Sequence, residues 1–223
     1  MPATPTDGVP AAMPTTSPTS DNKQQLKSKR KLHMFQEIVA GEYFTEAQAT
    51  TGIILAGKTK KYWVDKNGNN CFMLFPRGMS IAWAENPDYW SWQPMEQGSD
   101  HDVGIEVAEL KNVCWLEIVG KQELSHLTPG VTYEVIFEAM LKRKSSGWHV
   151  PLDLRLKFPD GRVQEQKESL QERYSEEELQ LKVGDVEAKK GLEGELVVSL
   201  SQHGGHWKRG LIIKGIRFTT KKR

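Results

Sequence analysis

The sequence predicts an all-β protein built as an antiparallel β-sandwich. From Lys60 onward, apolar residues recur at every second position, the runs are rich in β-branched and aromatic residues, and turn residues separate them at short intervals. The clearest run covers residues 152–158, where Leu and Phe alternate with charged residues before Pro159-Asp-Gly. A chain of 223 residues is long enough for one such domain with extensions.

The N-terminal part of the chain has a different composition. Residues 1–21 are dominated by Pro, Thr, Ala and Ser, and a short basic run follows. Such a stretch buries too little apolar surface to offset its ordering entropy, so we predict a disordered tail and linker over residues 1–33. Residues 34–58 show partly helical apolar spacing interrupted by glycines, which predicts one short helix. The β domain is expected over residues 59–220.

The strands of the β domain are expected in the following order. Residues 62–64 and 71–75 flank an Asn-Gly turn and predict a hairpin. Further strands are expected over residues 79–84, 113–124, 133–141, 152–158, 196–200 and 211–218. The stretch 162–183 is rich in Gln, Glu and Lys, which suits either a polar helix or a long solvated loop, and its charge does not decide between them.

The charge and hydropathy of the chain exclude several protein classes. The chain contains 30 Lys and Arg and 29 Asp and Glu, which gives a net charge of +1. Any electrostatic attraction to nucleic acid or a membrane must therefore come from local patches of charge. A mean hydropathy of −0.56 and the lack of an apolar run of about 18 residues argue against a transmembrane helix. The N-terminus does not resemble a signal peptide, and we expect a cytoplasmic protein.

The two cysteines, Cys71 and Cys114, are too few for a disulfide-built scaffold. Cys114 is expected on the same strand face as Leu116 and Ile118, which predicts a buried thiol. Cys71 follows a polar turn and is expected at a strand end. We therefore expect Cys71 to react with a thiol reagent sooner than Cys114.

Motifs of catalysis are lacking in the sequence. Neither the Gly-x-Ser-x-Gly motif of hydrolases nor the glycine-rich motifs that bind phosphate occur. The histidines are scattered, and the close pair His203 and His206 has no cysteine or carboxylate cluster beside it. The residues alone give no support for catalysis but do not rule it out. Our expectation is a protein that is not an enzyme, with no catalytic residue, no metal and no cofactor.

Tryptophan is frequent, with seven residues, and three of them lie close together between residues 83 and 92. A flat indole covers the C–H face of a sugar ring, and neighbouring carboxylates accept hydrogen bonds from its hydroxyls. The segment predicts a carbohydrate-binding site made of Trp83, Trp90, Trp92, Glu85 and Asp88. The alternative is a hydrophobic plug, and we expect at least one of the three indoles to be buried. Core or rim packing is expected for the remaining four, Trp63, Trp115, Trp148 and Trp207.

Several separated motifs resemble the phloem protein 2 family of plant lectins, which contains the Nictaba-type domain. They include Lys61-Tyr-Trp-Val-Asp65, Ser80-Ile-Ala-Trp83, Pro87-Asp-Tyr-Trp90-Ser-Trp92, Val113-Cys-Trp-Leu-Glu117 and Trp207-Lys-Arg-Gly-Leu-Ile-Ile-Lys-Gly215, and they span about residues 59–220. The resemblance implies a jelly-roll sandwich, a homodimer, and binding of chitooligosaccharides (N-acetylglucosamine oligomers) and N-glycan cores. It also implies a location in phloem sieve elements and companion cells, and it ties Trp83 and Trp90 to sugar binding.

Two other functions are compatible with the sequence. The first is an RNA-binding carrier that moves ribonucleoprotein through the phloem, with the basic residues of 23–31 and 221–223 contacting phosphates. The second is a structural role in phloem filament protein, linked through intermolecular disulfides of Cys71 or Cys114. The non-enzymatic lectin is the leading hypothesis, and these two functions are its alternatives.

Overall fold

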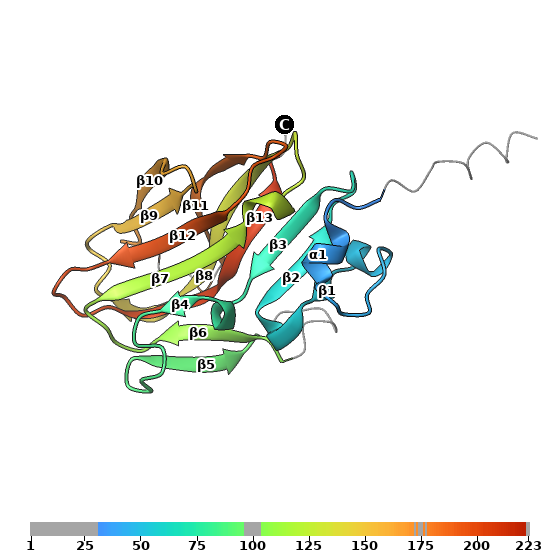
Figure 1. The fold of residues 1–223 in the computed structure, drawn as a ribbon. Coiled ribbons are helices and arrows are strands. Elements are labelled where there is room, and N and C mark those ends of the chain that lie inside the picture. The colour runs from blue at the N-terminus through green and yellow to red at the C-terminus, as the bar shows by residue number, and fades with distance from the viewer. Residues whose placement is uncertain (1–30, 96–103, 172, 174–175, 177, 222–223) are drawn as a thin grey trace, which may run out of the picture. The chain divides into compact units, whose positions relative to one another are not determined.

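Two antiparallel sheets stacked face to face make up the fold in this computed structural model, which describes residues 31–95, 104–171, 173, 176 and 178–221 (Figure 1). The larger sheet contains β1 (Ile53–Ile54), β2 (Lys60–Val64), β3 (Asn70–Leu74), β5 (Trp90–Pro94), β6 (Glu106–Leu110), β8 (Thr132–Ser146), β11 (Glu178–Glu187) and β13 (Arg209–Thr220). The smaller sheet contains β4 (Ser80–Ile81), β7 (Leu116–Glu123), β9 (Leu152–Lys157), β10 (Val163–Glu168) and β12 (Glu195–Gln202), in the order β10-β9-β12-β7-β4.

Strand β13 is the centre of the larger sheet. One edge pairs with β8, which in turn pairs with β11, while the other edge is shared between β6 and β3. From β4 onward the chain passes repeatedly from one sheet to the other, so that strands close in sequence often lie in opposite layers. This arrangement confirms the expected jelly-roll sandwich.

The core lies between the two sheets and follows the period of two along the strands. In β9 and β12 every second residue is fully buried, including Leu154, Leu156 and Val198. The layers approach closely at Gly120 of β7, where an added Cβ would lie 2.4 Å from Cδ1 of Ile216 in β13. Only a glycine fits there without displacing its neighbour.

The N-terminal segment before the β domain contributes one short α-helix, as expected. Helix α1 (Phe35–Val39) buries Phe35, Ile38 and Val39, and the ring of Phe35 lies 6.2 Å from that of Tyr62. The segment also supplies strand β1, which pairs with β2. Short 3-10 turns occur at η2 (Gln48–Thr50), η3 (Ala56–Lys58), η4 (Pro76–Gly78) and η6 (Leu124–His126). The tail expected over residues 1–33 lies outside the described residues, except for its last three positions.

The expectation for residues 162–183 was wrong, because much of this stretch forms strands rather than a helix or a loop. Strand β10 has polar residues on both faces because it is the outer strand of the smaller sheet and pairs only with β9. Strand β11 buries Leu179, Leu181 and Val183 against the core. The side-chain amide of Gln164 accepts a hydrogen bond from the backbone N–H of Asp185 (3.0 Å) and donates one to its carbonyl (2.8 Å). These two bonds connect β10 to the bulge in β11.

Two further boundaries differ from the expectation. Of residues 79–84, only Ser80–Ile81 pair as a strand, and the chain then turns. Cys114 lies in a bend before β7 and is half-buried, whereas Cys71 within β3 is only 1% exposed. No helix in the described part of the chain is long and apolar enough to span a membrane.

The close approach of the sheets makes a testable prediction for Gly120. We expect Gly120→Ala to lower the free energy of unfolding by about 1–3 kcal/mol, because the new methyl group overpacks the contact with Ile216. Urea unfolding measures the change. Gly205→Ala is the control, since an added Cβ at Gly205 would meet nothing within 4 Å. Equal stabilities for both variants would contradict the role of this contact.

The burial of the cysteines reverses the expected order of reactivity. Burial raises the pKa of the Cys71 thiol to about 12, and the thiolate is the reacting species. Brief alkylation of the native protein at pH 8, read by mass spectrometry, should therefore label Cys114 and spare Cys71. Labelling of Cys71 should appear only after denaturation. Early labelling of Cys71 would show that β3 opens readily.

Candidate functional site

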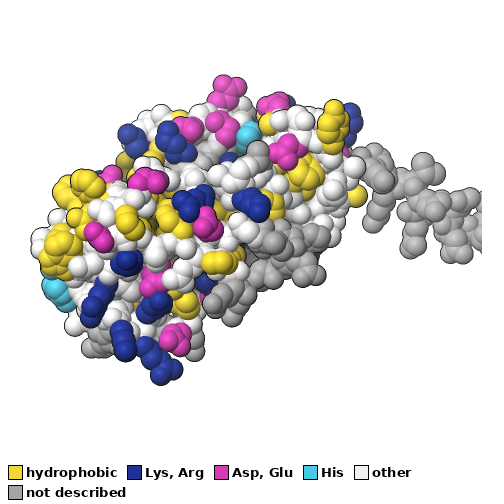
Figure 2. All heavy atoms as spheres, turned by 90° about the horizontal axis from the view of Figure 1, so that it is seen from below, with side chains coloured by type: hydrophobic (Ala, Val, Ile, Leu, Met, Phe, Trp, Pro, Cys, Tyr) yellow, Lys and Arg dark blue, Asp and Glu magenta, His cyan; other side chains and the backbone are white. Residues whose placement is uncertain are grey.

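Loops at one end of the sandwich carry three exposed indoles. The β4–β5, β6–β7, β8–β9 and β12–β13 connections lie at this end (Figure 1). Of the six large hydrophobic side chains exposed among the described residues, three are Trp83 (62%), Trp115 (49%) and Trp207 (55%) in these loops. Figure 2 shows hydrophobic side chains gathering at the same end, on the left. We call Trp83, Trp115 and Trp207 the loop-end surface.

Trp83 stands on a turn whose backbone is held by two other indoles. Its φ of 62° is left-handed, a conformation that costs a non-glycine residue about 1 kcal/mol or more. The indole N–H of Trp90 donates to the carbonyl of Ala82 (3.0 Å), and that of Trp92 donates to the carbonyl of Ala84 (3.4 Å). The carbonyls on both sides of Trp83 are thus fixed, and its ring projects from a defined position.

Trp90 and Trp92 themselves are less accessible than Trp83. Trp90 is 2% exposed and packs in the core, which agrees with the expectation that at least one of the three indoles is buried. Trp92 is half-buried, and the Arg77 guanidinium lies 3.6 Å from the centre of its ring. Glu106 holds Arg77 in place at 2.7 Å. Their geometry makes Trp90 and Trp92 supports of the Trp83 turn.

The acidic residues predicted for the site lie on the same loop as Trp83. Glu85 and Asp88 are both exposed on the β4–β5 loop. Asn86 Oδ1 accepts a hydrogen bond from the backbone N–H of Asp88 (2.9 Å), and the ring of Tyr89 meets that of Trp83 edge-on at 6.4 Å. Trp83, Glu85 and Asp88 are therefore all exposed on the same β4–β5 loop.

A second aromatic platform at this end was missed by sequence reasoning. The rings of Trp115 and His203 stack with centroids 3.9 Å apart and planes 12° from parallel. Glu117 Oε2 accepts from Trp115 Nε1 (3.2 Å) and lies 3.0 Å from His203 Nε2. The backbone N–H of Ala82 donates to the Glu117 carbonyl (2.9 Å), which connects this platform to the Trp83 turn.

The expectation of core or rim packing holds for some of the remaining tryptophans and fails for others. Trp148 is 3% exposed and donates to the carbonyl of Arg209 at 3.0 Å, as expected for a core residue. The expectation was wrong for Trp115 and Trp207, which are exposed. Alternation already placed Trp115 on the face opposite Leu116, and that pattern was the available sign of exposure.

A buried lysine fixes the β12–β13 loop. Lys208 is fully buried, and its Nζ donates to the carbonyls of Cys114, His206 (3.0 Å) and Gly204 (3.5 Å). Burial lowers the pKa of this ammonium group. Because Cys114 precedes Trp115, these bonds hold the β12–β13 loop against the β6–β7 loop and so position two parts of the loop-end surface.

The described residues contain no group of three or more His, Cys, Asp or Glu side chains that could hold a metal ion. The rings of His149 and His206 lie 4.4 Å apart between two of the loops, without a third such side chain beside them. The loop end presents aromatic rings that can stack on a ligand and polar groups that can form hydrogen bonds with it.

Comparison with known proteins assigns the chain to a family. Residues 69–220 match the family model described as Phloem protein 2. The chain belongs to the phloem protein 2 family. A lectin from Luffa acutangula is 43% identical over 177 residues, covering 78% of this chain and 83% of the relative. Protein PHLOEM PROTEIN 2-LIKE A1 from Arabidopsis thaliana is 39% identical over 179 residues, covering 78% and 72%.

Membership of the phloem protein 2 family confirms the resemblance seen in the sequence, and with it a lectin-type protein rather than an enzyme. Among solved structures, the chain is similar to the CBM22-1 xylan-binding domain from Paenibacillus barcinonensis Xyn10C. That similarity has a TM-score of 0.39 and 11% sequence identity, and it covers 67% of this chain and 89% of the domain. At this level it says nothing about the ligand of the phloem protein 2 chain.

The support that Trp90 gives to the Trp83 turn can be tested by removing one donor. We expect Trp90→Phe to lower the free energy of unfolding by about 1–3 kcal/mol, because it keeps an aromatic ring but leaves the Ala82 carbonyl without its partner. Denaturant titration measures this change. Trp92→Phe should cost less, since its bond is longer and its side chain is more exposed. The opposite ranking would contradict this account of the turn.

Proposed function

We propose that the protein is a lectin that binds chitooligosaccharides and N-glycan cores at the loop-end surface, without any chemical step. The observation that carries the proposal is the exposed indole of Trp83, held on a fixed turn of the loop that also carries the exposed residues Glu85 and Asp88. Membership of a family with a relative named as a lectin supports the same ligand class.

The geometry suits a sugar for two physical reasons. The ring of Trp83 offers an apolar surface to the C–H groups of a pyranose, and the two carboxylates accept hydrogen bonds from its hydroxyls. The turn is already fixed by the indole bonds of Trp90 and Trp92, so little conformational entropy is lost when the ligand binds. The Trp115–His203 platform provides a second surface for a neighbouring ring of the same glycan.

As part of this proposal, we place the protein in the cytoplasm of phloem sieve elements and companion cells, as a homodimer. Both statements come from the family resemblance. The described residues add no support for RNA binding. The basic ends of the chain lie mostly outside the described residues, and Lys221 forms an ion pair with Asp185 at 2.6 Å. If the protein forms disulfide-linked filaments, Cys114 is the better candidate for the intermolecular bond, because both thiols are free and Cys114 is the more accessible.

Replacing the central indole tests the proposed function. We expect Trp83→Ala to weaken the binding of N,N′,N″-triacetylchitotriose about tenfold or more, because stacking on one aromatic ring contributes about 1–3 kcal/mol. Isothermal titration calorimetry measures the affinity. Tyr43→Ala is the matched control, because Tyr43 is a fully exposed aromatic residue outside the loop-end surface. A folded Trp83→Ala protein with unchanged affinity would remove this surface as the sugar site.

A further inference from the structure

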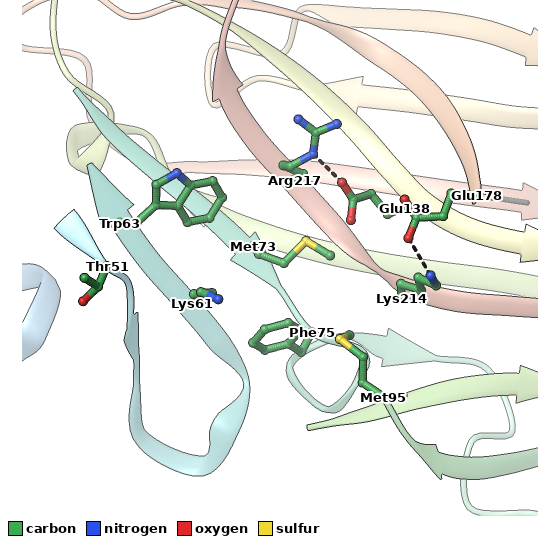
Figure 3. Close-up of a pocket in the computed structure, with 10 residues that line it drawn as sticks. All are labelled: Thr51, Lys61, Trp63, Met73, Phe75, Met95, Glu138, Glu178, Lys214 and Arg217. Carbon is green, nitrogen blue, oxygen red and sulfur yellow. Dashed lines mark hydrogen bonds and ion pairs between the residues drawn. The ribbon is translucent and has the colours of Figure 1, made fainter. Parts of the chain in front are cut away.

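The outer face of the larger sheet contains a hollow that the loop-end surface does not use. Its volume is about 360 Å³, which falls in the range of about 300–1,000 Å³ typical of ligand pockets. The lining side chains come from strands β2, β3, β8, β11 and β13 and from the segments beside β1, β3 and β5 (Figure 3). None of them belongs to the loop-end surface.

The hollow has an apolar side and a charged side. Trp63, Met73, Phe75 and Met95 form the apolar side, and Trp63 is half-buried there. Among the described residues its indole N–H has no hydrogen-bond partner, which leaves one donor for a ligand. As at Trp83, a partly accessible indole can cover the C–H face of a sugar ring.

The charged side contains two ion pairs, and Lys61, which has an interaction of its own, also lines the hollow. Arg217 pairs with Glu138, and Lys214 Nζ lies 2.7 Å from Glu178 Oε1 (Figure 3). An anionic or cationic ligand would have to compete with one of these pairs. A neutral ligand with hydroxyl groups can donate to the carboxylates and accept from the cations while both pairs stay intact. The charges therefore favour a neutral, hydroxyl-rich ligand.

A second, larger hollow continues from the first. It measures about 1,240 Å³ and shares Trp63 and Arg217 with the smaller one. Its lining is polar at the β2–β3 turn, where Asp65, Asn67 and Asn69 lie. Trp63 thus stands in the middle of a groove that has room and hydrogen-bonding groups on both sides of the indole.

We propose that this groove is a second carbohydrate site, in which a neutral sugar ring lies against Trp63 and its hydroxyls bond the Arg217–Glu138 pair. One chain then binds two glycans at separate surfaces. Such a chain could link two glycoproteins, and its avidity for a surface with many glycans would exceed the affinity of either site.

The test follows the indole N–H signals of the wild-type protein by ¹H–¹⁵N NMR during titration with N,N′,N″-triacetylchitotriose. The wild-type titration does not depend on the folding of any variant. We expect the Trp63 and Trp83 signals to shift and saturate with separate dissociation constants. Calorimetry should give two sugars bound per chain, falling to one in Trp63→Ala and to one in Trp83→Ala.

The outcomes separate this inference from the proposed function. A response at Trp83 alone, with one sugar per chain, overturns the groove site and leaves the loop-end site standing. A response at Trp63 alone overturns the loop-end site and supports the groove. No response at either indole overturns both. If the sites are independent, Trp63→Ala should change the affinity at Trp83 by no more than about twofold.

Discussion

The close packing of β7 against β13 is the contact on which the candidate site depends. At Gly120 the two sheets meet with no space for a side chain, because Ile216 lies directly against the backbone. Strand β7 begins just after Trp115, and β13 begins just after Trp207. Any change in the spacing of the layers would therefore move both indoles, so the rigid sandwich sets the geometry of loops that are themselves irregular.

Tryptophan has two separate roles in this molecule. A buried indole N–H needs an acceptor, and backbone carbonyls need a donor. From within the core, Trp90 donates to the loop carbonyl of Ala82, and Trp148 donates to the carbonyl of Arg209 at the start of β13. The exposed indoles of Trp83 and Trp115 then stand on backbones that cannot rearrange easily. A site of this kind offers large flat surfaces and loses little conformational entropy when a ligand binds. Both features favour the binding of a weakly polar ligand.

The outer face of the larger sheet shows how paired charges shape a surface. Apolar side chains such as Met73 and Phe75 are buried there although no second sheet covers them. Long charged side chains lie beside them and bind one another, as Arg217 and Glu138 do. The result is a polar face with little net charge, which suits neutral ligands better than phosphates. Both proposed sites therefore point to the same class of ligand by different physical means.

The sequence alone determined the sandwich, the positions of most strands along the chain and the family, because these depend on local alternation and on motifs. Strands β5 and β6 were not predicted. Alternation also tells which residues share a face, but it does not tell which face another layer covers. Only the tertiary structure decided that Trp115 is exposed, that Cys71 is buried and that residues 163–168 form a strand. Each of these depends on a partner distant in sequence, such as Asp185 for Gln164.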